Sequence, residues 1–182
     1  MYKLKYFLLI TILLLPLSVA GQGHEVYSVL THSLNQSQAA MNSLLGSITN
    51  LTEVYRNRDV NTRKRFVLQV QANLAQSVVS LQSAQEYVQQ ALREAHETTP
   101  TDFTIKIEHL DKQIGETKLK LSEAVAYSAQ AQHETNSDRA QADLQELSTR
   151  IESSVKQLDE VLEGLREVVE EWAIGFYVHN LN

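Results

Sequence analysis

The 182-residue sequence contains no cysteine. This absence excludes disulfides, thiol nucleophiles and Cys-ligated zinc sites. Small exported domains often depend on disulfides, so a domain of that kind without cysteine has to be stable through burial of apolar surface alone.

Motifs that organise catalytic sites are missing as well. The sequence has no Glu-x-x-His, which a di-metal site in a helical bundle needs on two helices, and no phosphate-binding loop or nucleophile elbow. A row of carboxylates at Glu160, Glu163, Glu167 and Glu170 lies off the apolar spacing, so we expect a solvated face rather than metal ligands. We predict a protein that is not an enzyme, with no catalytic residue, cofactor or metal. A Ser/His/Asp triad needs no contiguous motif and stays open from sequence.

An excess of basic residues is also lacking, with 16 Lys and Arg against 22 Asp and Glu. Residues 1–20 have the pattern of a cleavable signal peptide, because Lys3 and Lys5 precede an apolar run and Ser18-Val19-Ala20 offers small residues for cleavage. Without them, 14 basic residues face 22 acidic ones, a net charge of −8. That balance argues against nucleic acid as a partner. We predict secretion to the extracellular space, or to the periplasm if the source is bacterial.

What the sequence does contain is an apolar stripe with helical spacing, repeated four times. Within the predicted helix 137–174, apolar residues recur at steps of three and four. They are Leu144, Leu147, Ile151, Val155, Leu158, Val161, Leu162, Leu165, Val168, Val169 and Trp172. The same spacing predicts helices over 24–55, 62–96 and 100–132. Asn61 or Thr62 is the expected cap of the second helix.

The turns between these segments are short, so consecutive helices must run in opposite directions. We therefore predict that residues 21–182 form one all-α domain, an elongated, antiparallel (up-down-up-down) four-helix bundle with coiled-coil-like packing. Two hairpins that pair or swap between chains satisfy the same pattern, which leaves a homo-oligomer open.

Serine occupies several positions of the stripes where leucine would bury more surface. Examples are Ser37, Ser77, Ser128 and Ser154. Small residues allow helices to approach closely, and they also reduce the apolar area that holds a bundle shut.

Three groups of residues are candidate sites. Asn35 and Asn50 begin glycosylation sequons, on the side of their helix away from the stripe. Arg56, Arg58, Arg63, Lys64 and Arg65 cluster at the first turn between mature helices and are a candidate site for an anionic partner.

The third group lies near the C-terminus, where Trp172, Phe176 and Tyr177 fall within six residues. Our preferred interpretation is that they cap the open end of the core, and the alternative is an exposed apolar contact patch. Gly175 can end the helix and fold the tail back, or lie within a continuing helix.

The leading hypothesis for function is a secreted, non-enzymatic bundle that acts by contact with a protein partner. The alternative is an exchangeable carrier of lipid or another hydrophobic ligand, which opens its bundle to bind and could meet a membrane surface. In architecture alone, a cysteine-free exported amphipathic bundle is similar to insect exchangeable apolipophorins, which have more and shorter helices. That similarity transfers no site residue.

Overall fold

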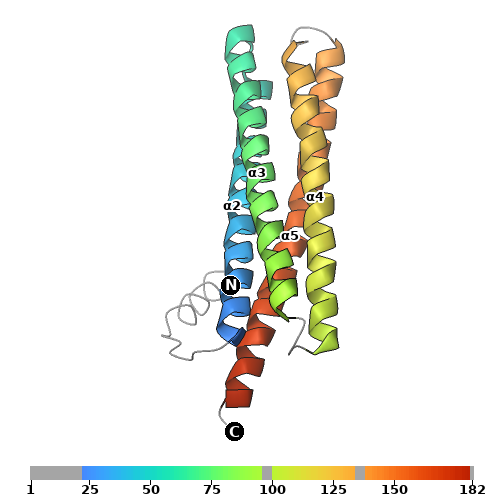
Figure 1. Ribbon diagram of the computed structural model, residues 1–182. Helices are drawn as coiled ribbons and strands as arrows, with labels where there is room; N and C mark the ends of the chain where they lie inside the picture. Colours follow the sequence, from blue (N-terminus) through green and yellow to red (C-terminus); the bar gives the residue numbers. More distant parts are fainter. Residues whose placement is uncertain (1–21, 96–99, 134–137, 181–182) are drawn as a thin grey trace.

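The computed structural model describes residues 22–95, 100–133 and 138–180, with side chains for 25–95, 100–131 and 141–175. These residues form four long helices and no strand (Figure 1). The helices are α2 (Gln22–Arg56), α3 (Val60–Ala95), α4 (Thr101–His133) and α5 (Asp138–Asn180). The predicted all-α four-helix bundle is confirmed, whereas the proposed signal peptide lies outside the described residues.

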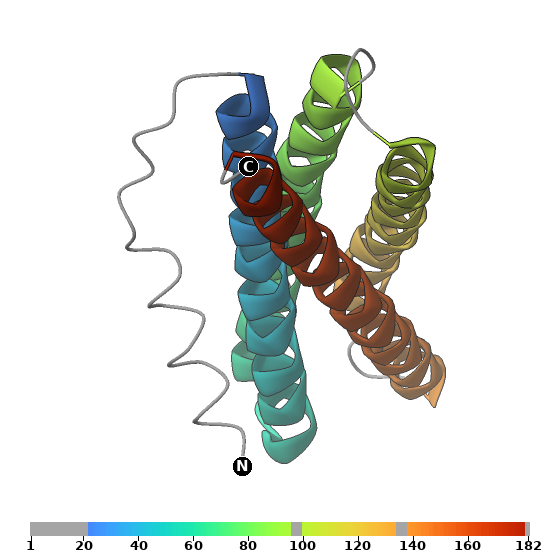
Figure 2. The same ribbon diagram turned by 90° about the horizontal axis from the view of Figure 1, so that it is seen from below.

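The helices alternate in direction and pack as neighbours in a ring. α2 lies against α3, α3 against α4, α4 against α5, and α5 returns to α2. Figure 2, in which the molecule is seen from below, shows α5 running obliquely from beside α4 toward the N-terminal end of α2. The turn between α2 and α3 therefore lies at the opposite end of the bundle from the C-terminal end of α5 (Figure 1).

A seven-residue repeat explains why each helix buries a single narrow face. Every helix contributes two rows of buried residues, and members of a row are seven positions apart. In α2 the first row is Leu30, Ser37, Leu44 and Leu51, and the second is Ser33, Ala40, Ser47 and Val54. In α3 the first row is Val67, Leu74, Leu81, Val88 and Ala95, and the second is Val70, Ser77, Ala84 and Ala91. In α4 the first row is Ile107, Ile114, Leu121 and Ser128, and the second is Phe103, Leu110, Thr117, Ala124 and Ala131. In α5 the first row is Leu144, Ile151, Leu158 and Leu165, and the second is Leu147, Ser154, Val161 and Val168.

Hydroxyl groups tie α2 to α3. Ser33 donates a hydrogen bond to the carbonyl of Ala84 at 2.9 Å, and Ser77 donates to the carbonyl of Ala40 at 3.0 Å. A third, longer contact joins Ser47 to the carbonyl of Val70 at 3.5 Å. A side chain as short as serine can reach the backbone of another helix only where the two helices lie very close together. We call the three serines and the carbonyls that accept their hydrogen bonds the hydroxyl seam of α2 and α3. The sequence alone did not reveal that these serines bond between helices.

The helix ends lie within two residues of the prediction except at the end of α5, and two of the differences have a local cause. α3 begins at Val60 rather than 62, because the Oδ2 atom of Asp59 accepts a hydrogen bond from the backbone N–H of Thr62 at 2.7 Å. Asp59 is thus the cap in place of Asn61 or Thr62. α5 continues to Asn180 rather than ending at 174, because Gly175 stays in the helix. No glycine among the described residues has a positive φ angle.

Candidate interaction surface

The predicted basic cluster forms one end of the bundle, which we call the basic turn: Arg56, Arg58, Arg63, Lys64 and Arg65. Arg58, Lys64 and Arg65 are exposed. Arg56 pairs with Glu53 at 3.1 Å, and Arg63 turns inward, with a buried Nε atom that has no hydrogen-bond partner. In the described part of the chain, Lys64 and Arg65 form no ion pair with a carboxylate. Their charge is therefore available to an outside partner.

Two neighbouring groups modify the electrostatics of the basic turn. The hydrogen bond from the backbone of Thr62 lowers the pKa of Asp59, which keeps one carboxylate ionised among the arginines. Burial raises the pKa of Tyr55, although the nearby charge of Arg63 acts in the opposite direction. The basic turn thus keeps a net positive charge, and the carboxylate of Asp59 caps α3.

An exposed apolar stripe on α3 begins directly beside the basic turn. It consists of Leu68, Ala72, Ala75 and Val79, and all four side chains are exposed. Leu68 is 46% and Val79 59% accessible to solvent. The steps of four, three and four place them on one side of the helix. We call these residues the apolar stripe of α3.

The apolar stripe was missed at the sequence level because these residues do not belong to the core rows. The sequence nevertheless contains the pattern, because these four apolar residues recur at steps of four and three between the core positions. No Asp, Glu, Lys or Arg occurs between Phe66 and Gln85, so this segment of α3 carries no charge. At its far end Gln82 accepts a hydrogen bond from Lys118 of α4 at 2.6 Å.

The opposite end of the bundle is acidic. Asp102, Glu167, Glu170 and Glu171 are all exposed there, and we call these four residues the acidic end. Lys106 of α4 bonds to Glu171 of α5 across the helix interface. This hydrogen bond raises the pKa of Lys106, an effect that slight burial opposes and that the charge of Glu167 strengthens.

The C-terminal group of candidates divides into two parts. Trp172 is half-buried against the core, and its ring lies 4.8 Å from the ring of Phe103 at the start of α4. It therefore covers the core at this end of the bundle. The side chains of Phe176 and Tyr177 lie outside the described residues, so their part in the cap stays a prediction.

The two sequon asparagines differ in exposure. Asn35 is exposed and Asn50 is half-buried, both on α2. A glycan is therefore accommodated more easily at Asn35 than at Asn50.

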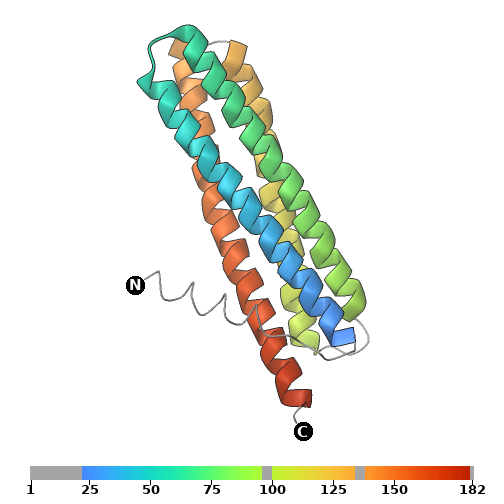
Figure 3. The ribbon, with the colours of Figure 1, turned by 90° about the vertical axis from the view of Figure 1, so that its left-hand side faces the viewer.

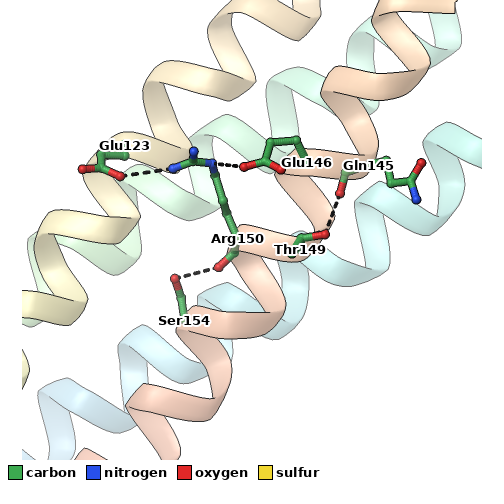
Figure 4. Close-up of polar contacts among 6 residues, drawn as sticks. All are labelled: Glu123, Gln145, Glu146, Thr149, Arg150 and Ser154. Carbon is green, nitrogen blue, oxygen red and sulfur yellow. Dashed lines mark hydrogen bonds and ion pairs between the residues drawn. The ribbon is translucent and has the colours of Figure 1, made fainter.

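A network of ion pairs around Arg150 joins α4 to α5 (Figure 4). Arg150 bonds to Glu146 on its own helix at 2.8 Å and to Glu123 of α4 at 3.1 Å. Its guanidinium also lies 4.6 Å from the ring centre of Tyr127. These contacts align two helices, and they leave Arg150 little capacity for a ligand.

The described residues contain no group of three or more His, Asp or Glu side chains that could hold a metal ion. The carboxylates of Glu160, Glu163, Glu167 and Glu170 are exposed on α5. Within the same described residues, no helix combines the length and the apolar character needed to cross a membrane.

Comparisons with known proteins give no relative for this chain. No protein-family model, no curated protein and no solved structure matches it.

Proposed function

We propose that this chain is a secreted, non-enzymatic helical bundle that acts by protein–protein contact through the outer face of α3. The observation that carries the proposal is the junction of the apolar stripe with Lys64 and Arg65, two cations without carboxylate partners. A stripe of three helical turns with charge at one end has the chemistry to bind an amphipathic helix.

The surroundings of the stripe support a protein as the partner. The centres of protein interfaces are depleted in charged residues, and 66–85 is free of them. The two cations favour a partner that brings acidic side chains to one end of the contact. The negative net charge of the chain disfavours nucleic acid in the same position.

Secretion is part of the proposal, and it is supported by the charge and apolar pattern of residues 1–20. In a eukaryotic source Asn35 would then be the better glycan acceptor of the two sequons. Asn35 lies on α2 and so is not itself part of the stripe on α3.

The test is affinity capture from the native extracellular fluid with matched variants of the mature chain. Val79→Glu places a charge in the stripe, and Ile105→Glu places the same charge on an exposed residue of α4 that is 56% accessible. We expect Val79→Glu to abolish capture of a specific protein that the parent and Ile105→Glu both retain. Equal capture by all three chains, each checked for unchanged helicity, would refute the role of α3.

The alternative function, a carrier of hydrophobic ligands, has one structural observation in its favour. Among the side chains that the structure describes, eight buried Ser and Thr residues occupy core positions where larger apolar ones would bury more surface. The hydroxyl bonds join α2 to α3, so opening would separate this hairpin from α4 and α5. A carrier should bind lipid vesicles with a shift in the emission of Trp172. Unchanged emission and no co-sedimentation with vesicles would exclude it.

A further inference from the structure

The C-terminal part of α5 extends beyond the rest of the bundle (Figures 1 and 3). The helix continues for eight residues after Trp172, a length of about 12 Å. Ile174 is 64% exposed, and a Cβ at Gly175 would meet no heavy atom within 4 Å. We call residues 173–180 the projecting end of α5.

The projecting end is apolar in sequence and follows acidic residues. Residues 173–178 read Ala-Ile-Gly-Phe-Tyr-Val, and Glu167, Glu170 and Glu171 come directly before Trp172. Along the chain direction the order is thus acidic, then apolar. On the outer face of α3 the order is basic, at Lys64 and Arg65, and then apolar.

From this correspondence we infer that the projecting end of α5 of one copy docks on the apolar stripe of α3 of a second copy. Parallel docking sets Glu167 and Glu170 beside Lys64 and Arg65. It also sets Ile174 against the stripe. The inference rests on the proposed function, because it uses the same face of α3.

The geometry of the bundle permits this contact. The projecting end of α5 and the basic turn lie at opposite ends of the bundle (Figure 1). A helix that leaves the acidic end of one copy and runs parallel to α3 of the next places the two bundles end to end. The acidic end of one bundle then faces the basic turn of its neighbour, which is electrostatically favourable.

A head-to-tail contact leaves one free donor end and one free acceptor face on every assembly. Such a contact does not close on itself by two-fold symmetry, so assemblies grow by addition of further copies. The stripe and the projecting end are both short, and the contact is smaller than a standard stable interface. We therefore expect self-association that depends on concentration and weakens as salt screens the charges.

The test uses two variants of the mature chain, each with one half of the contact removed. Val79→Glu damages the stripe and keeps the projecting end, whereas a chain that stops at Ala173 keeps the stripe and lacks all but the first residue of the projecting end. Ile105→Glu again serves as the control, and a cooperative thermal transition with helical content in proportion to chain length confirms that each variant folds. The measurement is the average mass by sedimentation equilibrium across a hundredfold range of concentration.

We expect the parent and the control to gain mass with concentration beyond two chains, and each variant alone to stay a monomer. A one-to-one mixture of the two variants should form pairs and nothing larger, because one variant supplies the donor and the other the acceptor. Self-association of the truncated chain alone would overturn the inference in favour of a symmetric contact. A monomeric parent, or a mixture that stays monomeric, would also overturn it.

This outcome is separable from that of the proposed function. If the truncated chain captures an outside protein through α3 while the parent stays a monomer, the proposed function holds and the self-docking inference fails. If Val79→Glu changes neither capture nor mass, both fail together.

Discussion

Replacing Gly164 by alanine tests how closely α4 and α5 approach each other. A Cβ at position 164 would lie 2.8 Å from the Cδ2 atom of Leu110, closer than Cβ atoms pack in proteins. Leu110 belongs to a core row and is only 2% exposed, so its side chain cannot move out into solvent. The substitution therefore forces atoms together between two helices.

Two effects of opposite sign decide the result. Alanine is favoured over glycine in a helix interior by about 1 kcal/mol. Overpacking a well-filled core costs about 1–3 kcal/mol. Because the neighbour is buried, we expect the second effect to be larger and Gly164→Ala to destabilise the bundle by about 1 kcal/mol. That loss lowers the melting temperature of a domain of this size by about 2–4 °C.

Gly115→Ala is the matched control. Its Cβ would meet the Nε2 atom of Gln85 at 3.0 Å, but this atom is the tip of a flexible, half-buried side chain. The helical preference should therefore dominate, with a gain of up to about 1 kcal/mol. Urea denaturation followed by circular dichroism measures both changes.

A double-mutant cycle identifies the cause. Leu110→Ala removes the contacted atom, so Gly164→Ala should become stabilising in that background. If Gly164→Ala stabilises the parent as much as Gly115→Ala does, the close approach of α4 and α5 at this position is wrong.

Four further substitutions test local interactions. Ser33→Ala removes a buried hydrogen bond to another helix and should cost about 1 kcal/mol, whereas Ser37→Ala removes a buried hydroxyl that has no partner and should be neutral or stabilising; equal losses in denaturant melts would contradict the hydroxyl seam. The lowered pKa of Asp59 means that its stabilising contribution is present above the ordinary pKa of 3.8 and is lost as pH falls through the lower value in the folded state. Asp59→Asn should cap the helix without this pH dependence, so a parent and variant with parallel pH profiles of melting would refute the cap. Arg150→Lys keeps the charge but loses the fork and the stacking on Tyr127, and thermal melts should show a loss of about 1 kcal/mol or less; a more stable variant would argue against the network.

The fold could be predicted because it depends on a pattern that can be recognised in each helix without knowing which helices pack against it. The repeat of apolar residues at three and four positions fixes which face of each helix is buried, and short turns fix the direction of the next helix. Helix ends depend instead on single side chains. Asp59 was overlooked because the broken pattern drew attention to Asn61 and Thr62, although an acidic residue three positions before an N–H is an ordinary cap.

Gly175 shows a second limit of sequence. Glycine tolerates both a helix and a turn, so its presence alone does not decide whether the chain folds back. The basic turn was predictable because its members are neighbours along the chain. The hydrogen bond from Ser33 to the carbonyl of Ala84 was not, because it joins residues fifty-one positions apart in sequence and depends on the register of α2 against α3.

The hydroxyl seam of α2 and α3 also bears on the order in which the protein folds. Only residues 57–59 separate the two helices, so closing this hairpin costs little chain entropy, and its contacts are local. We expect α2 and α3 to form the first stable unit and their backbone amides to exchange with solvent most slowly. We propose secretion for this chain, and if it crosses the membrane unfolded, half of the bundle can assemble as soon as residue 95 has emerged, before α4 and α5 are available.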